Sequence, residues 1–291
     1  MRPVDFLLMV GICLIWAVNA VLSRYVIVVA GVPPIFLSAS RFLLAGMVLW
    51  PFLRPLPRPL LPVVATGLLM GAGHFGLLLS GYGLISAALA AILLQVGIPM
   101  TAILSALVLR ERIGLRRGIG IAIAFAGTIV VLWRPGEISA GLGAGLVLLA
   151  AASLALGSVL LKRLGGMTPL RMQAWTASTS IVPLALVSML LEHDQVAKAS
   201  THGVAFASLL LFSALIVTVI SHTAYYRLLR LYDASIVSSL TLMFPLLTVA
   251  LGIMVLGEKT TSSFWIGTIM AIIGVGVILL RETKTPVVVS S

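Results

Sequence analysis

The sequence predicts an all-α membrane protein of ten transmembrane helices, arranged as two inverted five-helix repeats with both termini in the cytoplasm. Three observations support this prediction: the hydrophobicity of the chain, the spacing of its apolar runs, and a repeat between its two halves. Of the 291 residues, 60% are hydrophobic and only 9% are charged. A soluble domain carries about 25% charged residues, so this chain could not cover its own surface in water.

The first five expected spans are apolar runs of roughly 20 residues, the length that crosses a hydrocarbon core of about 30 Å. The first run resembles a signal peptide, but nine similar runs follow, so we interpret it as an uncleaved span. Proline, glycine and charged residues mark the ends of the runs. The breaks are Arg24, Pro33-Pro34, Arg54 and Arg110-Glu111-Arg112, and the spans are 4–24, 34–53, 61–81, 86–109 and 117–134.

The second half of the chain divides in the same way. Its breaks are Lys162-Arg163, Glu192, Arg227 and Glu258-Lys259, and its spans are 141–161, 169–191, 204–227, 234–257 and 264–281. Lys and Arg are enriched in cytoplasmic loops of membrane proteins. Fourteen of them fall on the side of the N-terminus and four on the other side, so the sequence predicts that both termini are cytoplasmic.

A shift of 147 residues superposes 85–132 on 232–279, with thirteen of 48 positions identical. The repeat divides the chain into residues 1–136 and 137–291, and an odd number of spans per repeat inverts the second copy. Inverted repeats are common in secondary transporters, where the two halves give alternating access to a site near the midplane. Pro99 and Pro245 fall at mid-membrane in the repeated helices, and they act either as hinges or merely as packing kinks.

The stretch GYGLISAALAAILLQVGIPMTAILSALVLRERIGLRRGIGIAIAFAGTIVVL and its second copy from RLYDASIVSSLTLMFPLLTVALGIMVLGEK resemble the drug/metabolite transporter superfamily. More narrowly, the whole chain resembles the EamA-like ten-span exporters of that superfamily. The resemblance implies a multi-pass protein of the bacterial inner membrane that exports amino acids or other small metabolites, and aromatic amino acid exporters belong to this group. Export of amphipathic drugs or cations is the alternative.

Polar residues inside the spans are the candidate substrate-binding residues, because a polar group in lipid is costly. Trp16, Asn19 and Ser23 share a face of the first span, and His74 and His222 are near-equivalents in the two repeats. For each of these residues, a hydrogen bond that only joins neighbouring helices is the competing interpretation. The full set of candidates is Trp16, Asn19, Ser23, His74, Tyr82, Gln95, Trp175, His222, Tyr225 and Ser238.

All eight acidic residues lie at span ends or in loops, so no carboxylate is expected at mid-membrane. This favours a neutral or zwitterionic substrate over a cation. We expect the one basic residue inside a span, Arg41, to snorkel to the non-cytoplasmic surface, with carboxylate binding as the alternative. Proton coupling would require His74 or His222, and a facilitator is equally compatible with the sequence.

Other classes of protein fit the sequence poorly. It lacks the H-E-x-x-H and G-x-S-x-G motifs and an embedded Asp pair, which argues against an intramembrane enzyme. The basic residues form no patch of the kind that binds nucleic acid. The sequence therefore predicts a transporter without cofactor or metal, embedded in the lipid bilayer as a monomer or weak dimer.

Overall fold

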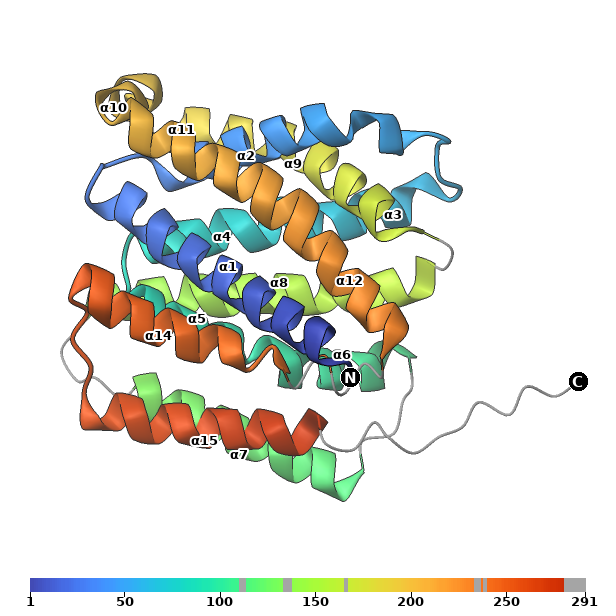
Figure 1. Ribbon diagram of the computed structural model, residues 1–291, viewed down its shortest axis with the longest axis vertical. Coiled ribbons are helices and arrows are strands. Elements are labelled where there is room, and N and C mark those ends of the chain that lie inside the picture. Colours follow the sequence, from blue (N-terminus) through green and yellow to red (C-terminus); the bar gives the residue numbers. More distant parts are fainter. Residues whose placement is uncertain (110–113, 133–137, 165–166, 233–236, 238–239, 280–291) are drawn as a thin grey trace, which may run out of the picture.

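The computed structural model describes residues 1–109, 114–132, 138–164, 167–232, 237 and 240–279, and the regular elements in these ranges are all helices (Figure 1). The N-terminal half contains α1 (Pro3–Val28), α2 (Pro34–Leu49), α3 (Leu60–Leu68), α4 (His74–Tyr82), α5 (Ala87–Leu94), α6 (Gly97–Leu109) and α7 (Leu115–Leu132). The C-terminal half contains α8 (Ile138–Leu164), α9 (Pro169–Leu191), α10 (Gln195–Thr201), α11 (Gly203–Leu211), α12 (His222–Leu231), α14 (Met243–Leu256) and α15 (Ser262–Leu279). A short 3-10 helix, η1 (Trp50–Leu53), extends α2, and two π-helical segments, η2 (Leu69–Gly73) and η3 (Phe212–Ser221), join α3 to α4 and α11 to α12.

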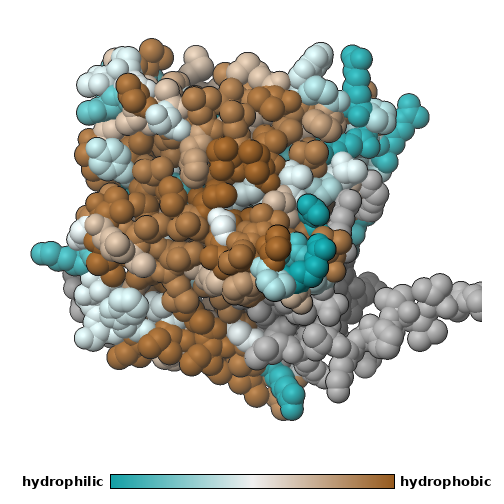
Figure 2. Space-filling model, in the orientation of Figure 1, coloured by the Kyte–Doolittle hydropathy of each residue, from teal (hydrophilic) through white to brown (hydrophobic). Residues whose placement is uncertain are grey.

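Apolar residues cover the outside of the bundle as well as its core. The visible face is broadly hydrophobic, with hydrophilic residues gathered mainly toward its edges (Figure 2). By length and composition, seven helical segments can cross a membrane: Pro3–Val28, Pro34–Leu53, Leu60–Tyr82, Ala87–Val108, Gly141–Leu164, Pro169–Leu191 and Gly203–Tyr225. Three shorter apolar helices, Gly118–Leu132, Met243–Leu256 and Ser262–Ile278, lie where the other three spans are expected, and the count of ten membrane crossings stays a prediction.

The helices run back and forth between two ends of the bundle (Figure 1). We name the end at which α1 begins the near end, and the end at which α1 finishes the far end. α2 packs against α9, α4 against α8, and α1 against α14 and η3. Helices from the two halves of the chain therefore contact one another across the bundle, and α7 with α15 forms one edge of it (Figure 1).

The helices α7 and α15 cross with almost no space between their backbones. A β-carbon built on Gly120 would lie 2.8 Å from the carbonyl oxygen of Gly274, and one on Gly127 would lie 2.7 Å from that of Gly267. Small residues of this kind let membrane helices approach closely. The pairing is antiparallel, and a shift of 147 residues exchanges Gly120 with Gly267 and Gly127 with Gly274, so the same contact occurs twice. We call this contact the glycine seam.

The repeated helices are each interrupted just before their proline. α5 ends at Leu94 and α6 begins at Gly97, which places Pro99 in the first turn of α6. α14 begins at Met243, so Pro245 is its third residue, as Pro99 is the third residue of α6. The first turn of a helix tolerates proline, because its N–H groups have no partner within the helix. Both prolines thus begin helices, and their role as hinges stays a prediction.

Candidate functional site

Trp16, near the middle of α1, forms an aromatic cluster with residues of α12. Its ring centroid lies 5.4 Å from that of His222 and 5.3 Å from that of Tyr225. Its indole Nε1 donates a hydrogen bond of 2.9 Å to the Ser221 hydroxyl, which in turn donates to the carbonyl of Val217. The structure therefore brings together three of the predicted site residues from the two halves of the chain.

Asn19, one turn further along α1, contacts the same π-helical segment. Its side-chain oxygen Oδ1 accepts a hydrogen bond from the Ser213 hydroxyl of η3. Ser23, the next polar residue on this face of α1, is buried. Trp16 and Asn19 are thus turned toward η3 and α12 and away from the lipid.

Each of the two predicted histidines comes directly after a π-helical segment, since η2 precedes His74 and η3 precedes His222. π-Helical turns are rare and are frequent at functional sites. The Nδ1 atom of His74 lies 2.9 Å from the carbonyl oxygen of Ala150, and that of His222 lies 2.7 Å from the carbonyl oxygen of Val217. A carbonyl can only accept, so Nδ1 carries the hydrogen in each ring, and Nε2 is the atom that can receive a proton or a ligand donor.

Side chains of two neighbouring helices bind the backbone of η2. The Ser153 hydroxyl on α8 donates to the carbonyl of Leu69 at 2.7 Å, and the N–H of Ala72 donates to the Ser180 hydroxyl on α9 at 2.8 Å. A β-carbon on Gly157 of α8 would lie 3.3 Å from the side chain of Leu69, so α8 packs closely on η2, as its small residues predict. These contacts hold η2 in its π-helical form.

Arg41 is buried inside the bundle, so the expectation that its side chain snorkels to the membrane surface is wrong. Only 3% of its surface is exposed. Its guanidinium carbon lies 4.3 Å from the ring centroid of Phe75, and its Nε and Nη2 donate to the Thr218 hydroxyl at 3.3 and 3.0 Å. A desolvated cation–π contact is worth about 2 kcal/mol, and together with the hydroxyl it draws the side chain inward.

The other predicted residues have separate surroundings. Gln95 lies at the break between α5 and α6, and its buried Nε2 has no hydrogen-bond partner among the described residues. The indole Nε1 of Trp175 is also buried and has no hydrogen-bond partner within the described part of the chain. Tyr82 is buried at the end of α4, where its carbonyl accepts a hydrogen bond from Arg24. Ser238 lies outside the described residues.

Sequence reasoning missed three hydroxyl residues of η3 that contact polar residues of the candidate site: Ser213, Thr218 and Ser221. In an α-helix, residues five positions apart point about 140° away from each other, so Ser213 and Thr218 could not share a face. In η3 the Thr218 hydroxyl instead donates to the carbonyl of Ser213, five residues back, at 2.8 Å. A helical wheel with 3.6 residues per turn therefore misses this contact between the Thr218 side chain and the backbone of Ser213.

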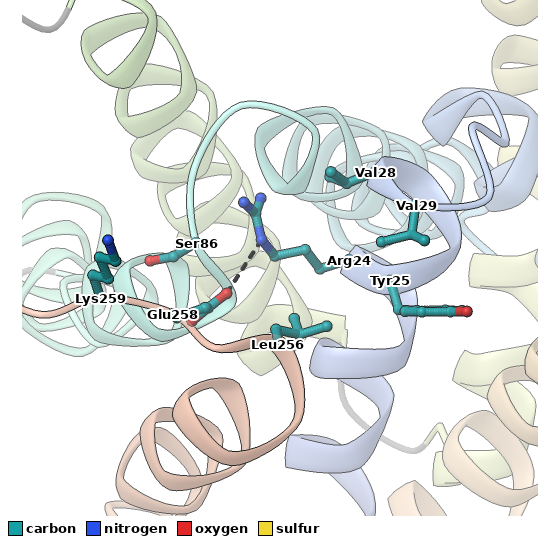
Figure 3. A pocket seen from close by; sticks show the side chains of 8 residues that line it. All are labelled: Arg24, Tyr25, Val28, Val29, Ser86, Leu256, Glu258 and Lys259. Atoms are coloured by element: carbon teal, nitrogen blue, oxygen red, sulfur yellow. Dashed lines mark ion pairs between the residues drawn. The ribbon is translucent and has the colours of Figure 1, made fainter.

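At the far end of the bundle, Glu258 joins three elements (Figure 3). Its carboxylate accepts hydrogen bonds from the N–H groups of Ala87 at 2.7 Å and Ala88 at 3.0 Å, at the start of α5. It also lies 3.2 Å from Nε of Arg24 on α1. A carboxylate at a helix N-terminus satisfies its free N–H groups and interacts favourably with its dipole. A cavity of about 260 Å³ adjoins the ion pair (Figure 3).

A second carboxylate at the far end caps another helix. Glu192, directly after α9, accepts hydrogen bonds from the N–H groups of Ile35 and Phe36 of α2 at 2.7 and 2.8 Å. Glu192 and Glu258 thus fix the starts of α2 and α5 against neighbouring elements. Glu111, the repeat partner of Glu258, lies outside the described residues.

Comparisons with known proteins identify the family of the chain. A profile described as the EamA-like transporter family matches residues 5–133 and again residues 141–280. The chain is 28% identical over 280 residues to a Salmonella typhimurium (strain LT2) protein named "Probable amino-acid metabolite efflux pump", with 93% of each chain covered. It is 28% identical over 276 residues to the "Uncharacterized inner membrane transporter YedA" of Escherichia coli (strain K12), with 91% of this chain and 88% of that protein covered.

A solved crystal structure whose description names no function has the same fold, with a TM-score of 0.64 at 20% identity. The alignment covers 96% of this chain and 98% of that one. The family profile matches the chain twice and leaves only short segments outside the matches. This chain therefore belongs to the EamA-like transporter family, within the drug/metabolite transporter superfamily.

Proposed function

We propose that this chain is a secondary transporter that exports amino acids or related small neutral or zwitterionic metabolites across the inner membrane. The observation that carries the proposal is the partly buried cluster in which Trp16 and Asn19 of α1 bind Ser221 and Ser213 of η3. Polar groups inside a membrane protein mark substrate paths. The printed names of the Salmonella and Escherichia relatives, an amino-acid metabolite efflux pump and an inner membrane transporter, support the same function and location.

Alternating access between two inverted repeats, residues 1–136 and 137–291, is the mechanism that we propose for this transport. The glycine seam supports it, because an antiparallel contact that occurs twice is what two inverted copies of one unit would make. The breaks before Pro99 and Pro245, which differ by one residue in the aligned repeats, supply a point where each repeat can bend. In this arrangement the near end, which carries most of the basic residues, faces the cytoplasm.

Export of amphipathic cations is the second candidate, and the aromatic cluster around Trp16 would suit such a substrate. The buried guanidinium of Arg41 opposes it, because a cationic ligand bound beside that side chain would meet a like charge. An amino acid with an apolar or aromatic side chain fits both features. Aromatic amino acids are therefore the first substrates to test.

The test is transport into proteoliposomes. The purified protein should take up labelled L-phenylalanine and L-leucine in exchange for the unlabelled compound inside the vesicles. Uptake without a pH gradient would identify a facilitator, whereas uptake only with a gradient would assign proton coupling, with His74 and His222 as the residues to replace next. Uptake of labelled tetraphenylphosphonium with no uptake of either amino acid would replace our proposal by cation export.

Trp16→Leu should lower the initial rate of amino acid exchange by about tenfold or more, because it removes the hydrogen bond to Ser221 and the ring contacts with His222 and Tyr225. The matched control is Trp50→Leu, since Trp50 is 65% exposed at the end of α2. Both variants are compared with wild type at equal amounts of reconstituted protein. If the two substitutions changed the rate equally, Trp16 would have no special place in the site.

A further inference from the structure

We propose that Arg41 binds the carboxylate of the transported molecule, so that a carboxylate is a required part of the substrate. This inference rests on the proposed function and assigns a substrate class to the same site. Arg41 lies about 10 Å along α2 from the start of that helix, which is at the far end of the bundle. This position is well inside the apolar region. Arginine stays charged in proteins, so its position places a permanent cation within the bundle.

Arg41 has no acidic partner among the described residues. The ion pairs in that part of the chain are Arg2–Asp5 and Arg24–Glu258, both at the ends of helices. The acids outside the described residues, Glu111, Glu137, Asp233 and Glu282, all lie beyond the ends of the expected spans in the sequence. A buried charge without a counter-ion is costly, and in membrane proteins it is typical of a binding site. The substrate is then the source of the missing negative charge.

Within the described ranges, the hydrogen bonds of Arg41 use only its Nε and Nη2. Its two hydrogen bonds go to a single atom, the Thr218 hydroxyl oxygen, whose own hydrogen is given to the carbonyl of Ser213. The planar guanidinium carries five N–H donors and can bind a carboxylate through two of them at once. Ser38 lies one turn earlier on the same face of α2, and its fully buried hydroxyl has no hydrogen-bond partner among the described residues. It supplies a further donor beside the guanidinium.

The segment η3 connects the guanidinium to the rest of the site. Thr218 binds Arg41, and Ser213 binds Asn19, so the two polar groups are held by residues of one π-helical segment. Trp16 is bound to the end of the same segment through its indole N–H. A zwitterion with its carboxylate at Arg41 would then find oxygen acceptors for its ammonium group near Asn19 and an aromatic surface for its side chain at Trp16.

The experiment compares an acid with its amide. Proteoliposomes containing wild type, Arg41→Gln, Arg41→Lys or the control Arg116→Gln, which changes an exposed residue of α7, are tested with labelled L-phenylalanine and L-phenylalaninamide. We expect wild type and the control to prefer the acid. Arg41→Gln should lose about tenfold to hundredfold in acid transport and with it the preference for the acid, and Arg41→Lys should fall in between. An unchanged acid-to-amide ratio in Arg41→Gln would overturn the inference.

A binding measurement separates the failure of this inference from failure of the proposed function. Benzoate is added to the purified protein in detergent, and the unfolding temperature is recorded. A rise in wild type that is absent in Arg41→Gln would support a carboxylate site even if neither amino acid were transported. No rise in wild type, with amino acid transport intact and the acid-to-amide ratio equal in all variants, would leave amino acid transport standing and remove Arg41 from the site.

The stability of the variants distinguishes a binding residue from a structural one. Removal of an unpaired buried charge relieves its desolvation, which offsets the lost contacts with Phe75 and Thr218. Arg41→Gln without ligand should therefore unfold at a temperature equal to or above that of wild type. A structural arginine would give the opposite result. A large fall in unfolding temperature for both Arg41→Gln and Arg41→Lys, with an unchanged acid-to-amide ratio, would show that Arg41 only holds helices together.

Discussion

The Gly274→Ala protein is expected to unfold at a much lower temperature than wild type, with a loss of about 3 kcal/mol in the free energy of unfolding. The added β-carbon would lie 2.7 Å from the carbonyl oxygen of Gly120 and 2.8 Å from Cα of Ala124. Both are backbone atoms, which cannot rotate away as a side chain can. α7 and α15 would have to separate along the glycine seam, and the packing of that edge of the bundle would be lost. Thermal unfolding of the purified protein in detergent measures the effect.

The same helix provides the matched control. A β-carbon on Gly276 of α15 would have no atom within 4 Å, and alanine is the better helix former by about 1 kcal/mol. Gly276→Ala should therefore be as stable as wild type or more stable. Gly127→Ala, at the repeat-related position, should lose about as much stability as Gly274→Ala. Equal losses at Gly276 and Gly274 would mean that the seam is no tighter than the rest of the helix surface.

The Glu258→Gln protein is expected to open at its far end. The substitution removes the negative charge that pairs with Arg24. In this pair the Glu258 side chain is only 6% exposed and the Arg24 side chain is 21% exposed. Breaking a buried ion pair by removal of one partner lowers the free energy of unfolding by about 3–5 kcal/mol. Because Arg24 is partly exposed, we expect a loss at or below the lower limit of this range. The amide would also weaken the hydrogen bonds that fix Ala87 and Ala88 at the start of α5.

Thiol labelling measures this opening. Ser86 lines the cavity beside the ion pair, and Cys13 is the single cysteine of the chain, so Ser86→Cys in a Cys13→Ser background gives one reporter. Its reaction with a membrane-impermeant maleimide should be faster when Glu258→Gln is added. The control is Lys259→Gln, which removes a charge from the same cavity but not from the ion pair. Equal labelling in both would contradict a closing role for Glu258.

The positions of the helices could be predicted from the sequence because they depend on local properties. The length of an apolar run and the residue that ends it are visible one segment at a time, and α9 begins and ends at the residues expected. The largest difference among the long spans is at Pro99, which was expected inside a helix and lies in the first turn of α6. Proline removes a hydrogen bond wherever it stands, so the sequence indicated the break but not its place.

The surroundings of Arg41 and Glu258 could not be predicted in this way. Whether a long basic side chain reaches the surface or turns inward depends on what the neighbouring helices offer, and Phe75 and Thr218 are distant in sequence. The sequence places Glu258 only at a break between two spans, whereas its function as a cap depends on its contact with α5. The candidate residues on α1 were easier to find, because one helix face held all of them.

In the π-helical segments, the number of residues sets the direction in which later side chains point, in addition to the identity of those residues. A π-turn holds one residue more than an α-turn, so a deletion within 69–73 that restored 3.6 residues per turn would rotate α3 against α4 by about 100°. Gly67, whose β-carbon would lie 2.6 Å from the Thr179 hydroxyl, could then no longer face α9 while His74 faces α8. The orientation of this histidine thus depends on one inserted residue. In any related chain, the number of residues between the positions of Gly67 and His74 would show whether this residue is present.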